Sequence, residues 1–111
     1  MEVQVTTEDV GARTVVRVAG EVDVASADRL RERLAVLLSQ GRTDLVVDLT
    51  GVTFLDSTGL GLLVGTLKRV RLAGGRLELV VDSERLLKVF RITGLTQVFA
   101  IHDTLDGALA S

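Results

Sequence analysis

Apolar and polar residues follow their clearest pattern between residues 44 and 72. Leu45 to Leu49 form an almost unbroken apolar run, which predicts a buried strand over residues 44–49 with other strands beside it. We expect the chain to turn at Thr50 and Gly51 directly after this strand. Apolar side chains then recur at helical spacing, at Leu60, Leu63, Val64, Leu67 and Val70. This region therefore predicts a strand, a loop and an amphipathic helix over residues 57–72.

The residues before this unit predict a hairpin and a first helix. Val3 and Val5 alternate with polar neighbours and residues 14–19 alternate in the same way, so we expect two strands joined around residues 9–11. Ser26 is expected to cap a helix that ends at Gly41. The inward face of this helix is expected to hold Leu30, Leu34, Leu37 and Leu38.

The residues after the central unit predict two more strands and two more helices. A strand is expected over residues 76–81, after the helix of residues 57–72 has ended at Gly74 and Gly75. Ser83 is expected to cap the next helix, which Thr93 and Gly94 end. A short strand over residues 97–101 then leads to a last helix, with Asp103 as its expected cap.

Strands that alternate with helices after an initial β-hairpin predict an α/β fold. We expect a single domain over residues 1–111, built on a mixed β-sheet of about five strands that about four helices cover. Right-handed crossovers between parallel neighbours are the default for the later units.

Composition and charge narrow the classes of partner. Lys and Arg number 13 against 15 Asp and Glu, with no basic run, so nucleic acid is not an expected partner. The chain has no Cys and one His, which makes a zinc site improbable, and we expect no metal and no cofactor. The longest uncharged stretch, residues 57–67, is too short to span a bilayer. We expect a cytoplasmic protein without a membrane partner.

Polar residues gather where the predicted helix of residues 57–72 begins. Asp56 or Ser57 can cap this helix, and a phosphate would be well placed at its N-terminus. Ordinary capping is the competing explanation for both residues. Asp23 lies in a second polar segment and is expected near the same loop, where a simple turn or capping role competes with a role in phosphorylation.

The motif Asp56-Ser57-Thr58-Gly59-Leu60-Gly61 resembles that of the bacterial anti-sigma-factor antagonists, the STAS-domain proteins. The resemblance extends to residues 20–23, to the glycine pair at 74–75 and to the late turn at 93–95. It implies that Ser57 is phosphorylated by a partner that is both anti-sigma factor and serine kinase, and that a phosphatase reverses the modification. Thr58 stands where many relatives have Ser, and it is a weaker candidate acceptor.

The outward side of the same helix is the predicted partner surface. If Leu60, Leu63 and Leu67 face inward, helical geometry places Thr58, Gly61, Leu62, Gly65 and Arg69 on the opposite side. Two glycines beside an exposed Leu leave backbone accessible to a close partner. Ser57 lies at the rim of this surface, together with Asp56 and Asp23.

Enzyme interpretations have weaker support. The glycines of residues 59–65 have dinucleotide-like spacing, but residues 50–58 separate them from the predicted end of the strand. A serine hydrolase would need His102 to reach Ser57, and the chain has no nucleophile-elbow motif. His102 is expected to be a surface or capping-region residue beside Asp103. Core packing is the expected role of Phe54, Phe90 and Phe99.

We therefore expect a binding switch and not an enzyme. By the family resemblance, the unmodified protein binds an anti-sigma factor and frees the sigma factor, and phosphorylation of Ser57 abolishes this binding. The added charge of about −1.5 to −2 gives the switch a physical basis. Two alternatives remain open: a constitutive STAS interaction module without phosphorylation, and a small-ligand domain that binds a nucleotide through residues 59–65.

Overall fold

The computed structural model describes residues 3–111 and contains a five-stranded sheet in the order β1-β2-β3-β4-β5. The strands are β1 (Val3–Val10), β2 (Arg13–Val22), β3 (Asp44–Leu55), β4 (Arg76–Val80) and β5 (Ala100–His102). β1 and β2 form an antiparallel hairpin, and every later neighbour in the sheet is parallel. The predicted mixed sheet with an initial hairpin is confirmed.

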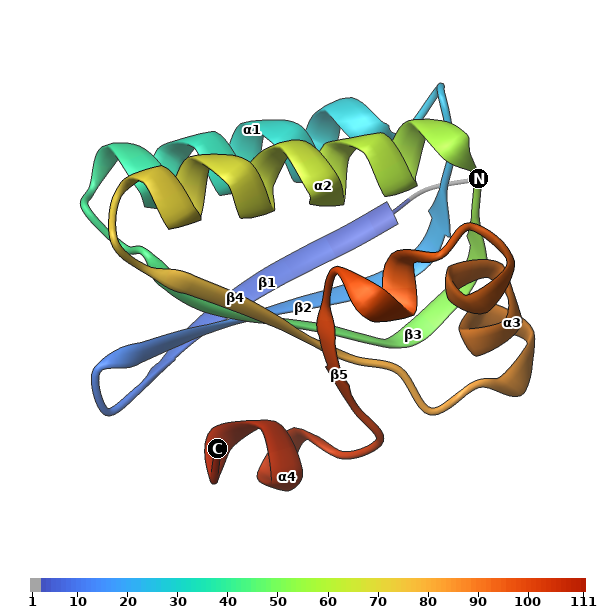
Figure 1. Cartoon of the computed structure of the whole chain (residues 1–111). Helices are drawn as coiled ribbons and strands as arrows, with labels where there is room; N and C mark the ends of the chain where they lie inside the picture. The colour runs from blue at the N-terminus through green and yellow to red at the C-terminus, as the bar shows by residue number, and fades with distance from the viewer. Residues whose placement is uncertain (1–2) are drawn as a thin grey trace.

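Four helices surround the sheet, as predicted: α1 (Ala27–Ser39), α2 (Ser57–Leu72), α3 (Glu84–Ile92) and α4 (Leu105–Leu109). A short 3-10 turn, η1 (Leu95–Gln97), precedes β5. Figure 1 shows α1 and α2 side by side on one face of the sheet, with α4 on the opposite face. Both long helices begin at the end of the sheet where β2 and β3 finish, so their N-termini lie close together.

The main core lies between the sheet and the pair α1 and α2. It contains the inward leucines predicted for both helices, Leu30, Leu34, Leu37, Leu60, Leu63 and Leu67, whereas Leu38 and Val64 are partly buried. Phe90 and Phe99 also belong to it, with their rings edge to face at 6.1 Å. A second, smaller cluster under α4 consists of Val15, Val46, Val80 and Ala108.

The central strand is longer than predicted, because the chain does not turn at Thr50 and Gly51. β3 continues to Leu55 and keeps pairing with β2 through two register irregularities. A Cβ on Gly51 would lie 3.0 Å from the Cβ of Ala19, so this glycine serves a close approach of two strands. The glycine that suggested a turn instead marks an irregular strand pair.

The structure refines two predicted caps and one predicted strand. Ser26 occupies the N-cap position of α1 as predicted, but its hydroxyl bonds the carbonyl of Glu21 and makes no capping hydrogen bond to the helix. α4 is capped by Thr104, whose Oγ1 accepts from the N–H of Gly107, and not by Asp103. β5 begins at Ala100 because the residues before it form η1. Ser83 caps α3 as predicted.

A polar network fastens α4 to the sheet. Arg13 is buried, and its guanidinium bonds the carbonyl of Ala108 at 2.7 Å and the Asp44 carboxylate at 2.9 Å. Glu78 Oε1 lies 2.7 Å from both His102 Nε2 and Ser111 Oγ. Of the two positions predicted for His102, the surface one is wrong, because its side chain is half-buried in this network.

Candidate functional site

The start of α2 is fixed by the residue that precedes it. Asp56 Oδ1 accepts hydrogen bonds from the backbone N–H groups of Thr58 at 3.0 Å and Gly59 at 3.1 Å. The backbone N–H of Asp56 in turn bonds the carbonyl of Val22 at 3.2 Å. Of the two caps that the sequence left open, Asp56 is thus the one observed, and it holds the helix start against the end of β2.

Ser57 occupies the first position of α2 and is exposed. Because the Asp56 carboxylate accepts from the N–H groups of Thr58 and Gly59, the cap does not depend on the Ser57 hydroxyl. Thr58 is half-buried, and its N–H belongs to the cap. The geometry therefore makes Ser57 the more accessible of the two hydroxyls.

The glycines of this helix separate into two kinds. Gly59 is buried, and a Cβ at this position would lie 2.4 Å from Leu55 Cδ1 and 2.9 Å from Val22 Cγ1. Gly61 and Gly65 are exposed, and a Cβ at either would meet nothing within 4 Å. Packing therefore explains Gly59, whereas the fold gives no packing reason for the other two.

Asp23 lies in the loop that joins β2 to α1 and organises that loop. Its Oδ1 accepts from the backbone N–H groups of Ala25 and Ser26, each at 3.0 Å. The hydrogen bond from the Ser26 hydroxyl, followed by that from the Ser26 backbone, lowers the pKa of the Asp23 carboxyl. The structure thus shows the turn-forming role that competed with a functional one.

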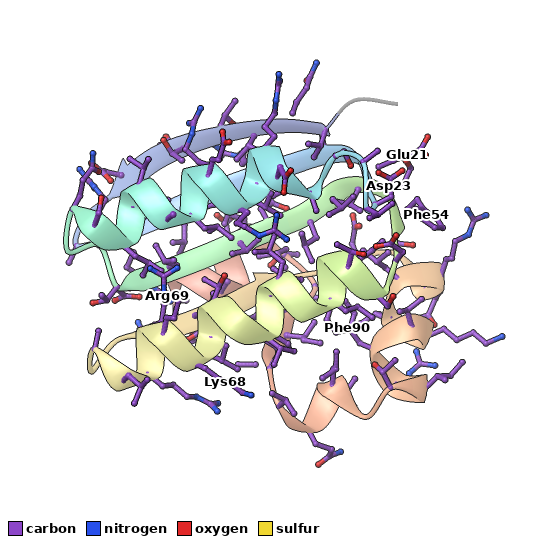
Figure 2. The ribbon with its side chains drawn as sticks, turned by 90° about the horizontal axis from the view of Figure 1, so that it is seen from above. Glu21, Asp23, Phe54, Lys68, Arg69 and Phe90 are labelled. Carbon is purple, nitrogen blue, oxygen red and sulfur yellow. The ribbon has the colours of Figure 1, made fainter. Side chains whose placement is uncertain are left out.

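The Asp23 loop and the Asp56 loop nevertheless lie at the same end of the sheet. β2 and β3 finish side by side, with Glu21 opposite Phe54 and Val22 opposite Leu55. Figure 2 shows Glu21, Asp23 and Phe54 gathered at this end, next to the start of α2. The predicted neighbourhood of Asp23 and the motif around Ser57 is confirmed.

A shallow groove runs between α1 and α2 with a volume of about 400 Å³. From α2 it is lined by every outward residue that the sequence predicted, together with the candidate acceptor, namely Ser57, Thr58, Gly61, Leu62, Gly65 and Arg69. Leu62 is not fully outward, since it is partly buried and packs against the main core. The predicted helical face thus forms one wall of the groove, and Figure 2 shows Arg69 on the side of α2 that faces α1.

Sequence reasoning missed two features of the site. Arg31 of α1 lines the groove opposite α2, and the packing of α1 beside α2 that brings it there leaves no signal in the local sequence. Phe54 is 49% exposed and Val24 is 76% exposed, although core packing was predicted for Phe54. The longer β3 explains the error, because Leu55 takes the buried position at the end of this strand.

The described part of the chain shows neither a metal-binding cluster nor a membrane-spanning helix. Within residues 3–111, no group of three or more His, Asp and Glu side chains is arranged to hold a metal ion. In the same residues no helix combines the length and the apolar character that crossing a membrane requires.

Known proteins resemble this chain over most of its length. Residues 2–108 match the family model of the STAS domain. The chain is 48% identical over 94 residues to the anti-sigma-B factor antagonist of Bacillus subtilis (strain 168), with 85% of each chain covered.

Solved structures show the same likeness. An anti-sigma factor antagonist from Mycobacterium paratuberculosis superposes with a TM-score of 0.90 at 30% identity, over 97% of this chain and 92% of that chain. The Bacillus cell fate determinant SpoIIAA in its phosphorylated form has a TM-score of 0.75 at 27% identity, over 96% of this chain and 97% of that chain.

Proposed function

The chain belongs to the STAS domain family, and on that premise we propose that it is an anti-sigma factor antagonist switched by phosphorylation of Ser57. In its unmodified form it binds an anti-sigma factor and thereby frees the sigma factor. The relatives that support this role are antagonists by name, and one similar structure is a phosphorylated protein. The protein acts as a regulatory binding module and not as an enzyme.

The proposal rests on the different roles of Asp56 and Ser57 at the start of α2. Asp56 makes the capping hydrogen bonds, while Ser57 is exposed on the first turn of α2. A kinase can therefore modify the hydroxyl without breaking the helix start. The positive end of the helix dipole stabilises the phosphate that results.

The effect on the partner follows from charge. A phosphate adds about −1.5 to −2 charges and three acceptor oxygens. Ser57 lines the groove between α1 and α2, so this charge enters the surface that we propose contacts the anti-sigma factor. A coupling of about 1–3 kcal/mol changes affinity about 5- to 150-fold, which is enough to redistribute a partner between competitors.

The neighbouring site residues have distinct roles in this proposal. Asp56 presents Ser57 by fixing the first turn, and Asp23 shapes the adjacent loop that the partner contacts. Thr58, Gly61, Leu62, Gly65 and Arg69 form the α2 wall of the contact surface. The anti-sigma factor is also the serine kinase, and a cytoplasmic phosphatase acting on phosphorylated Ser57 restores binding.

Phosphate mapping after reaction with the partner tests the function. The anti-sigma factor is captured from the source cell on the immobilised wild-type protein, purified and incubated with ATP and fresh protein. We expect mass spectrometry to place one phosphate on Ser57 and the modified protein to lose the complex in size-exclusion chromatography. A complex that forms without any phosphate transfer would identify a constitutive interaction module. A phosphate on Thr58 with Ser57 unmodified would refute the acceptor assignment.

A further inference from the structure

The groove between α1 and α2 carries charge of one sign. Among the residues that line it, the charged ones are Arg31 and Arg69, and no carboxylate is among them. Arg31 comes from α1 and Arg69 from α2, so the two cations stand on opposite helices. The groove is therefore positive, although the protein as a whole has a net charge of −2.

Both cations are available to a ligand in the groove. The nearest partner of Arg31 is Asp28, one turn earlier on the same helix. This pair is exposed at the surface, with 50% of the Arg31 side chain and 78% of the Asp28 side chain accessible. Exposed pairs of this kind contribute little, so a better-placed carboxylate can displace Asp28. Arg69 is exposed near the last turn of α2.

The α2 wall of the groove lets a partner come close to the helix backbone. Gly61 and Gly65 face it one turn apart, and a Cβ at either position would project into open space. Glycine weakens a helix interior relative to Ala, so the bare surface lowers helix stability without improving the packing. Leu62 lies between the glycines in sequence and supplies the apolar contact.

We propose that this groove binds an acidic segment of the anti-sigma factor, whose carboxylates pair with Arg31 and Arg69 while its backbone packs on Gly61 and Gly65. The inference rests on the proposed function and adds the chemistry of the partner. Charge complementarity selects this occupant, because a basic or neutral segment adds no counter-charge for Arg69 and leaves Arg31 with only its exposed pair to Asp28. It also explains the switch, since a phosphate on Ser57 stands at the same groove and competes for its positive field.

Removing the two positive charges tests the pairing with the purified anti-sigma factor. Arg31→Gln and Arg69→Gln are each expected to raise Kd about tenfold, and the double variant is expected to flatten the dependence of Kd on salt. Arg33→Gln is the matched control, because this exposed arginine lies on α1 outside the groove lining. Circular dichroism verifies that each variant is folded. Equal affinities for wild type, Arg33→Gln and the double variant would overturn the proposal while leaving the antagonist function intact.

A peptide pair tests the groove without the natural partner. One blocked helical peptide carries Glu at every fourth position among alanines, and the other carries Lys at the same positions. In NMR titrations of the whole protein, we expect the Glu peptide to shift the amides of Gly61 and Gly65, and the Arg31→Gln/Arg69→Gln variant to lose this response.

Other outcomes of these titrations would contradict the proposal. Equal shifts with the Lys peptide would contradict charge selection in the groove. Saturable shifts of the same amides with ATP alone would indicate a nucleotide site there and overturn the proposal. The antagonist function itself fails by a separate result, namely the absence of any complex between the wild-type protein and an anti-sigma factor.

Discussion

Gly59 lies against Leu55 so closely that a Cβ on Gly59 would stand 2.4 Å from the Cδ1 of Leu55. The first turn of α2 therefore packs directly on the last residue of β3. This contact, together with the hydrogen bond from the N–H of Asp56 to the carbonyl of Val22, sets the position of Ser57 at the end of the sheet.

Gly59→Ala is expected to destabilise the protein. The added methyl must displace the buried side chains of Leu55 and Val22, and such overpacking costs about 1–3 kcal/mol in most cores. Chemical denaturation measures the loss of unfolding free energy. An alanine variant as stable as wild type would show that these side chains yield without cost.

Gly61→Ala and Gly65→Ala are expected to have the opposite effect on stability. Both positions have open space for a Cβ, and alanine favours a helix interior by about 0.5–1 kcal/mol over glycine. The same methyl groups enter the groove, so affinity for the anti-sigma factor should fall as stability rises. Denaturation and isothermal titration calorimetry on the same samples check both signs. Unchanged affinity in both variants would remove the glycines from the contact surface.

Substitutions of Ser57 separate modification from binding. Ser57→Ala should bind the anti-sigma factor and accept no phosphate, because the cap is supplied by Asp56. Ser57→Asp should bind more weakly than Ser57→Ala, although one carboxylate carries less charge than a phosphate. Surface plasmon resonance compares the two variants. Identical binding by both would mean that negative charge at this position does not switch the complex.

Substitutions of two adjacent leucines of α2 should have different effects, one mainly on folding stability and the other mainly on partner binding. Leu63 is fully buried, so Leu63→Ala should lower the unfolding free energy by about 2–5 kcal/mol. Leu62 is partly buried and lines the groove, so Leu62→Ala should cost less stability and more partner affinity. Urea denaturation and binding titration give the two readouts. A larger stability loss at Leu62 than at Leu63 would contradict the helical register.

The network under α4 predicts that the folding stability of the protein falls in acid. Burial raises the pKa of the Glu78 carboxyl, but hydrogen bonds from Ser111 and His102 lower it. The charges of Arg13 and Arg76 lower it further, so the pKa lies below its usual value of 4.5.

The direction in which stability changes with pH follows from proton linkage. A carboxyl with a depressed pKa in the folded protein binds protons more readily when unfolded, so it contributes stability above pH 4.5 that is lost as the pH falls through the folded value. Glu78→Gln should be less stable at pH 7 and should show a weaker loss of stability on acidification. Thermal melts from pH 7 down to about pH 3 measure this. A parallel pH profile for wild type and Glu78→Gln would remove Glu78 as the cause.

Periodicity predicted the parts of this fold that local packing decides. The helix of residues 57–72 has the predicted bounds, because its buried leucines repeat at helical spacing and glycine follows it. The end of β3 was missed because it depends on an irregular pairing with β2, which no local pattern encodes. The C-terminal segment was placed loosely for a similar reason. Its last helix has five residues and is held by Arg13, which lies 95 positions from Ala108.

The candidate site was predicted where it rests on one contiguous motif. Ser57 and the outward residues of α2 follow one another in the chain, so helical geometry alone collects them on one surface. Arg31 joins that surface only through the packing of α1 beside α2. The exposure of Phe54 was likewise beyond local reasoning, because it depends on how β2 and β3 end together.

The cap at Asp56 also determines what kind of signal the domain can store. Since the helix start is held by the Asp56 carboxylate and not by the Ser57 hydroxyl, we expect the proposed modification of Ser57 to leave the fold in place and to change the surface charge. Under the proposed function, the phosphatase would then remove the phosphate from a structure that is already folded for binding. The molecule could be kept in reserve in its modified form and returned to use by a single hydrolysis, with no refolding delay.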